Sequence, residues 1–131
     1  MNVRDFDHLT ITVKNLNRTM RFYHEVLDLP VVSFTKKLLV IQLRHQKLVF
    51  RQVNQQYDPQ IAKPTPGATA FGLTAKDSLK YTKEHLINYG VKIIKGPVKT
   101  RGSNGPMNSI YVYDPDQNLI EISEAPQGKK H

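Results

Sequence analysis

Two segments near the ends of the chain, residues 7–13 and 119–123, alternate between apolar and polar residues. Both place an apolar residue at every second position: Leu9, Ile11, Val13, Ile120 and Ile122. Because successive side chains of a strand point to opposite faces, both segments are predicted to be half-buried strands. The opposite face of the first strand carries His8, and that of the second carries Glu121. These two residues are either hydrogen-bonded polar groups of the interior or parts of a site.

The pattern between these strands predicts one order of elements that is used twice. The first round has a strand at about 6–13 and a helix at about 15–28, followed by three short strands. The second round has a strand at 69–74 and a helix that Asp77 or Ser78 caps, followed by three more strands. The short strands are expected at about 31–35, 37–43, 47–53, 91–94, 109–113 and 119–123. This order predicts an α+β duplication rather than a doubly wound parallel sheet.

Residues at the helix ends support these boundaries. Asn15 precedes the first helix and is a suitable N-cap, and Gly90 follows the second helix where a left-handed residue is expected. Between the two rounds, residues 55–67 contain Pro59, Pro64 and Pro66, and this segment is predicted to be a linker. We therefore expect a single domain over 1–131, with modules at about 4–54 and 68–125.

Length and composition limit the class of protein. A chain of 131 residues is long enough for one hydrophobic core. No apolar run approaches the roughly 20 residues of a membrane span, and no signal peptide is apparent. Cysteine is absent, which excludes disulfides, thiolate metal ligands and a cysteine nucleophile. These absences indicate a cytoplasmic protein that does not bind membranes.

The formal net charge of +8 raises the question of nucleic-acid binding. The basic residues are scattered, and the densest groups are the pairs Lys36-Lys37 and Lys129-Lys130. A nucleic-acid-binding protein usually concentrates them on one element or stripe. We therefore expect no specific nucleic-acid partner. A basic protein does attract anionic small molecules, so a small-molecule ligand is the favoured partner.

Four motifs in this framework carry a family resemblance. They are Asp-His-Leu-Thr-Ile-Thr-Val at 7–13, Phe-Tyr-His-Glu-Val-Leu-Asp-Leu at 22–29, Gly-Pro-Met-Asn-Ser-Ile-Tyr at 105–111 and Asp-Pro-Asp-Gln-Asn-Leu-Ile-Glu at 114–121. With the doubled βαβββ order, they resemble the vicinal-oxygen-chelate superfamily of glyoxalase I, bleomycin-resistance proteins, extradiol dioxygenases and fosfomycin-thiol transferases. The resemblance covers about residues 4–125, and it is greatest to small, single-domain glyoxalase-domain proteins. It implies a curved, barrel-like sheet of eight strands with the helices outside, and a homodimer.

The resemblance also implies a divalent metal such as Zn, Ni, Mn or Fe, held by the first and last strands of each module. His8 and Glu121 match two of the four ligand positions. Repeat symmetry assigns the other two to Ala70 and Phe50, neither of which can bind a cation; Gln52 shares the face of Phe50 and is a weak substitute. Two protein ligands seldom hold a divalent ion tightly, so the metal site is expected to be degenerate and weak.

Other residues are candidates for binding a substrate. Thr10 lies on the same face as His8, and Ser109 and Tyr111 share a strand face. In the fosfomycin-thiol transferases, residues at these positions contact an anionic substrate, although Ala70 in place of the second histidine argues against that activity here. The segment 99–105 is predicted to be a glycine-rich loop, from which Arg101 could pair with a carboxylate or phosphonate. In a glyoxalase-like reaction, Glu121 would also be the catalytic base.

Three functional classes remain open at this point. The first is a metal-dependent enzyme, similar to lactoylglutathione lyase or to an extradiol dioxygenase. The second is a protein that binds or sequesters a small oxygen-rich or anionic metabolite in the cavity of the barrel. The third is a regulatory or structural dimer without catalysis. One fold hosts many chemistries, so the sequence does not name the substrate.

Overall fold

The computed structural model of the chain describes residues 1–124 and divides them into two compact units. The first unit contains residues 1–68 together with 115–117, and the second contains residues 69–114 together with the described residues from 118 onward. The expected linker, 55–67, falls within the first unit. None of the helices in the described part of the chain is long and apolar enough to cross a membrane.

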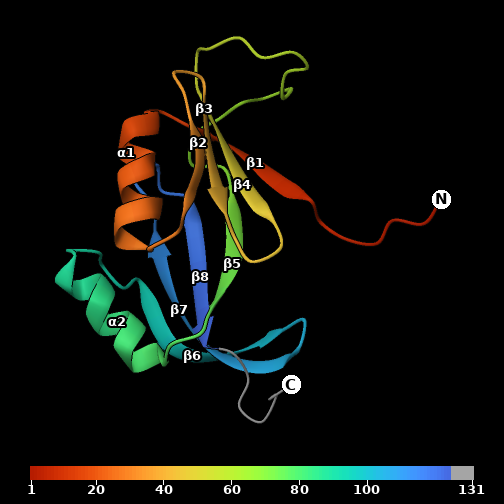
Figure 1. Cartoon of the computed structure of the whole chain (residues 1–131). Helices are drawn as coiled ribbons and strands as arrows, with labels where there is room; N and C mark the ends of the chain where they lie inside the picture. The colour runs from red at the N-terminus through yellow and green to blue at the C-terminus, as the bar shows by residue number, and fades with distance from the viewer. Residues whose placement is uncertain (125–131) are drawn as a thin grey trace. The chain divides into compact units, whose positions relative to one another are not determined.

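The first unit is a four-stranded sheet with one helical segment (Figure 1). Its elements, in chain order, are β1 (His8–Val13), α1 (Leu16–Met20), the π-helical η1 (Arg21–Val26), β2 (Val31–Phe34), β3 (Leu38–Gln42) and β4 (Lys47–Gln52). The sheet order is β1-β4-β3-β2, in which β1 runs parallel to β4 and the other pairs are antiparallel. The helix expected at 15–28 is therefore present, but its second half is a π-helix.

The second unit repeats this plan (Figure 1). Its elements are β5 (Ala70–Ala75), α2 (Leu79–Asn88), β6 (Lys95–Gly102), β7 (Gly105–Tyr113) and β8 (Leu119–Glu124). The sheet order is β5-β8-β7-β6, again with the first and last strands parallel. The α+β prediction of two βαβββ modules is thus confirmed. The prediction of one eight-stranded, barrel-like sheet is corrected, because hydrogen bonds join the described strands into two sheets of four.

Each sheet packs one face against its own helix. In the first unit this face includes Ile11 and Phe50, and the ring of Tyr23 lies 4.7 Å from that of Phe50. In the second unit the corresponding buried residues are Ile110, Val112, Ile120 and Ile122 of the sheet, with Leu79 and Leu86 of α2. Since side chains alternate along a strand, the neighbouring positions lie on the face opposite the helix of the same unit, here called the helix-free face.

The start of α1 is fixed by two side chains. The Asn15 side chain accepts a hydrogen bond from the Arg18 N–H at 2.9 Å, which confirms the predicted N-cap. The Gln52 side-chain oxygen, at the end of β4, accepts the Leu16 N–H at 3.1 Å. Both contacts satisfy amide groups that have no partner within the helix.

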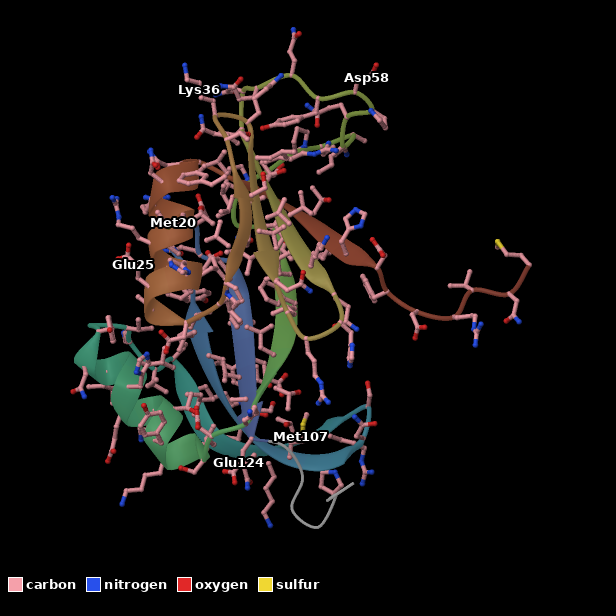
Figure 2. All side chains as sticks on the ribbon, viewed as in Figure 1. Met20, Glu25, Lys36, Asp58, Met107 and Glu124 are labelled. Carbon is pink, nitrogen blue, oxygen red and sulfur yellow. The ribbon has the colours of Figure 1, made fainter. Side chains whose placement is uncertain are left out.

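The start of α2 in the second unit is fixed in the same way, by two side chains. Ser78 accepts a hydrogen bond from the Tyr81 N–H at 3.1 Å. Glu124, at the end of β8 (Figure 2), accepts the Leu79 N–H at 2.9 Å. In both modules, therefore, the last residue of the last strand completes the N-terminus of the helix.

Two local predictions for the second unit are wrong. The segment 91–94 is not a strand, because Val91 donates its N–H to the Leu86 carbonyl at 2.9 Å and closes the end of α2 after Gly90. The segment 99–105 is not a loop but the β6–β7 hairpin, in which Arg101 pairs with Pro106. Its exposed and half-buried positions alternate, so a strand forms there without a run of apolar residues.

Replacement of Gln52 by alanine removes the acceptor for the Leu16 N–H. Loss of a helix cap typically costs about 1 kcal/mol, and we expect the free energy of unfolding to fall by that amount. Urea denaturation measures the change. Gln56→Ala, at an exposed position of the same unit, is the matched control and should change the value by less than about 0.5 kcal/mol. Equal losses in the two variants would contradict a capping role for Gln52.

Candidate functional site

Glu121 lies in the centre of the second sheet, on its helix-free face. Its neighbours across the sheet are Gly72 of β5 on one side and Tyr111 of β7 on the other. The adjacent residues Ile120 and Ile122 are buried on the opposite face. Glu121 is half-buried, so its carboxylate is accessible from the helix-free face and is not part of the apolar core.

A group of three hydroxyl side chains, here called the hydroxyl cluster, holds this carboxylate. Its members are Thr100, Ser109 and Ser123, and Ser109 is at its centre. The Ser109 Oγ donates to Glu121 Oε2 at 2.8 Å and lies 2.6 Å from each of the other two hydroxyl oxygens. Ser109 and Ser123 are buried, so water does not replace these partners.

The three protons of the hydroxyl cluster have a consistent assignment. Ser109 has one proton and gives it to Glu121, so its two lone pairs accept protons from Thr100 and Ser123. The Ser123 hydroxyl then donates mainly to Ser109, and its contact of 3.3 Å with Glu121 is the weaker of its two hydrogen bonds. In this arrangement all three hydroxyl groups point their protons toward the carboxylate, directly or through Ser109.

These contacts set the protonation of the site. Partial burial raises the pKa of Glu121, but the donors Ser109, Thr100, Ser123 and Tyr111 together outweigh it and lower the pKa below its usual value. Burial, followed by the charge of Glu121 and their hydrogen bond, raises the pKa of Tyr111. At neutral pH the site therefore contains an ionised carboxylate beside a neutral phenol.

The neighbouring strand β5 contributes no ligand to this carboxylate. Gly72 has no side chain, and a Cβ built there would lie 4.0 Å from the Glu121 Cβ, an ordinary contact. Ala70 is on the same face, and it is the position where the family pattern expects a histidine. Residues 1–124 contain no group of three histidine, aspartate or glutamate side chains that could hold a metal ion. The residues gathered around Glu121 therefore do not fit a divalent-metal site.

The remaining ligand candidates belong to the first unit. His8 begins β1, where its Nδ1 lies 2.8 Å from Asp7 Oδ2 and its side chain is 50% exposed. Thr10 lies on the same face of the sheet, opposite Val49 of β4. Both residues are on the helix-free face of their sheet, as the alternation predicts. Their convergence with Glu121 of the second unit stays a prediction.

The prediction that Phe50 is the first-module equivalent of Glu121 is wrong. Register assigns that position to Val49, because Thr10 pairs with Val49 as Gly72 pairs with Glu121. Phe50 is fully buried on the helix side, against Tyr23. Gln52 is on the same side and caps α1, so it is not a substitute oxygen ligand. Valine cannot bind a cation either, and the position offers no ligand.

Of the expected substrate-binding residues, the structure brings Ser109 and Tyr111 to Glu121. Arg101 is not brought there: it is exposed and, by alternation along β6, lies on the opposite face from Thr100. Thr100 and Ser123 belong to the hydroxyl cluster but were not predicted from the sequence. Ser123 is two residues after Glu121 and therefore shares its strand face, so strand alternation could have identified Ser123. For Thr100 no such signal existed, because its segment was expected to be a loop.

Comparison with known families matches residues 5–122 to the "Glyoxalase/Bleomycin resistance protein/Dioxygenase superfamily". The chain belongs to this superfamily. The matched range includes most of the described residues of both units, in agreement with the resemblance expected from the motifs.

Three relatives cover almost the whole chain. "Glyoxalase domain-containing protein RDO1" of Mycosarcoma maydis is 36% identical over 129 residues, which are 98% of this chain and 73% of that protein. "Virulence protein STM3117" of Salmonella typhimurium is 34% identical over 95% of this chain and 86% of that protein. Its crystal structure has a TM-score of 0.88 and covers 95% of this chain and 98% of that one. Integron cassette protein VCH_CASS1 of V. cholerae is 32% identical, with a TM-score of 0.90 over 96% of this chain and 98% of that one.

Replacement of Ser109 by alanine removes the main donor to Glu121, so the pKa of Glu121 should rise toward its ordinary value. A carboxylate with a lowered folded-state pKa stabilises the protein above its unfolded-state pKa, and this contribution is lost as the pH falls through the folded-state pKa. The variant should therefore lose less stability on acidification than the wild type does. NMR titration of the Glu121 carboxyl carbon measures the pKa, and Ser103→Ala at the exposed hairpin turn is the control. An unchanged pKa in Ser109→Ala would refute the proton assignment.

Proposed function

We propose that this protein binds a small oxygen-rich or anionic metabolite, with Glu121 and its hydroxyl cluster as the polar centre of the binding face. The observation that carries the proposal is an ionised, half-buried carboxylate whose Oε2 is held by internal donors, on the face of the second sheet opposite α2. Membership of a superfamily whose named members act on small molecules supports it.

The chemistry of the site defines what it recognises. An ionised carboxylate only accepts hydrogen bonds, so it favours a ligand that carries hydroxyl groups. Tyr111 stays neutral at physiological pH and presents a phenol beside this acceptor. A hydroxylated carboxylate or another small molecule with several oxygens meets this requirement, and the charge of +8 raises the local concentration of anionic ligands.

The lowered pKa of Glu121 favours binding over proton transfer. A general base is most effective when its pKa is near the working pH, and active sites usually raise the pKa of a carboxylate to reach that range. The hydroxyl cluster has the opposite effect on Glu121. Metal-dependent lyase or dioxygenase activity is the second candidate, because the family includes such enzymes. A sequestering or regulatory homodimer without catalysis is the third.

A thermal-shift screen tests the main proposal. We expect members of a panel of hydroxy acids, catechols and sugars to raise the melting temperature of the wild type. For such a ligand, Glu121→Gln should weaken the Kd by about tenfold or more, because a hydrogen bond to a charged group is lost. Glu84→Gln removes an exposed carboxylate from α2 and should leave the Kd unchanged. Ligands whose Kd is the same in all three proteins would show that binding occurs elsewhere.

Metal binding gives a separate test. Because the expected ligand positions hold Ala70 and Val49, purified protein should lose Zn, Ni, Mn or Fe on dialysis. Ala70→His places an imidazole on the same face as Glu121 and should tighten metal binding by about tenfold or more, or about 1.4 kcal/mol. Calorimetry measures this, with Ser103→His at the exposed hairpin turn as the control. Stoichiometric metal that survives dialysis of the unmodified protein would instead support a working metalloenzyme.

A further inference from the structure

A tyrosine on the segment after β4 is held rigidly against the first sheet. The Tyr57 hydroxyl accepts the Gln52 N–H at 2.9 Å and donates to the Lys37 carbonyl at 2.6 Å. These bonds use both the donor and an acceptor site of the phenol and join it to β4 and to the β2–β3 hairpin. The position of its ring is thus fixed by the backbone of two other segments.

Two cationic side chains lie over the ring of Tyr57. The Arg51 guanidinium carbon lies 4.8 Å from the ring centroid, and the Lys37 ammonium lies 5.4 Å from it. Both distances are within the range of a cation–π contact. Arg51 also donates from Nη1 to the Pro59 carbonyl at 3.1 Å. We call Tyr57, Arg51 and Lys37 the Tyr57 clamp.

No carboxylate neutralises the Tyr57 clamp within residues 1–124. The ion pairs of His8 with Asp7 and of Arg18 with Asp116 involve neither Arg51 nor Lys37. Asp58 is adjacent to Tyr57 in the chain, yet it forms no ion pair with Arg51 or Lys37. Lys36, at the tip of the β2–β3 hairpin (Figure 2), adds a further positive charge next to Lys37 in sequence. The positive charges of Arg51 and Lys37 are thus not ion-paired among residues 1–124.

One donor of the Tyr57 clamp also lacks an acceptor. The Arg51 Nε is buried and has no hydrogen-bond partner among the described residues. A buried donor left unpaired is costly, so the Arg51 guanidinium is not fully satisfied by its contacts within residues 1–124. Arg51 pairs in register with Thr12 of β1 and with Leu38 of β3, so it lies on the helix-free face that also carries His8 and Thr10.

We propose that Arg51, held by the Tyr57 clamp, binds the oxyanion group of a small ligand, a carboxylate or a phosphate, on the helix-free face of the first sheet. A guanidinium matches such groups because its donors form a planar fork, and it does so best when its orientation is already fixed. The stacked ring and the Pro59 carbonyl supply that orientation. The site consists of first-unit residues alone, so it does not depend on the proposed role of Glu121.

The test uses inorganic phosphate and acetate as probes, in separate titrations against sodium chloride of equal ionic strength. In the intact protein, the Arg51 Nε–H signal of a proton–nitrogen NMR spectrum should move downfield and saturate with one or both probes. Loss of that signal in Arg51→Gln assigns it. Saturation with phosphate alone identifies a phosphate site, and saturation with acetate identifies a carboxylate site; either supports the proposal.

Variants provide the second measurement. Arg51→Gln should weaken the Kd of the effective probe by about tenfold or more, whereas Arg44→Gln removes the same charge from an exposed turn and should leave it unchanged. Arg51→Lys keeps the positive charge but lacks the planar fork of donors, so its Kd for the probe should lie between those of Arg51→Gln and Arg44→Gln. If Arg51→Gln does not fold, loss of the Nε–H signal in Arg51→Lys assigns it instead, because lysine has no such group, and the NMR titration of the wild type still decides. An Nε–H signal that does not respond to either probe would overturn the proposal and leave the Tyr57 clamp as an anchor for residues 55–67.

Discussion

The parallel pairing of the first and last strands in each module is the constraint on which the rest of the structure depends. It sets β1 beside β4 and β5 beside β8, and so decides which residues of the four strands share a face. One face is then used by the helix, with Phe50 and Ile122 among its buried side chains. The same pairing carries Gln52 and Glu124 to the helix starts, where each accepts the first helical N–H. Sheet register and helix position are thus established together, and the other face of each sheet does not pack against the helix of its own unit.

The sequence was sufficient for most of this plan because its signals are local. The two-residue period identifies the faces of β1 and β8, and Asn15, Ser78 and Gly90 mark the helix ends. The alignment of the two modules is less secure, because Leu48, Val49 and Phe50 of β4 form a continuous apolar run that does not mark which face is buried. A shift of one residue exchanges the faces of a strand, which is why repeat symmetry predicts Phe50 at the position that the register assigns to Val49. The β6–β7 hairpin was missed for another reason: its exposed residues carry no apolar period.

The candidate site could be predicted only in part. Ser109, Tyr111 and Glu121 follow from motifs and strand alternation, and they do lie together. Thr100 and the Tyr57 clamp depend on contacts between segments that the sequence separates. Tyr57 lies in a proline-rich stretch that suggests only a linker, and nothing local shows that its hydroxyl reaches the Lys37 carbonyl. Such contacts require the register of the strands and the path of the chain, which composition does not encode.

The helix side of each sheet forms the core, whereas the helix-free side is not part of it. This difference explains how the fold can persist while its chemistry changes. Substitutions on the helix side open cavities in a packed core and are costly. Positions such as Val49, Ala70 and Gly72 are on the helix-free side, and none of them is fully buried. A metal ligand lost there leaves the sheet and the helix cap intact. Glu121 is held ionised by its hydroxyl donors, a state in which it accepts hydrogen bonds. Family membership therefore establishes the fold of this chain, whereas under the proposals above its function depends on a few side chains of the helix-free faces.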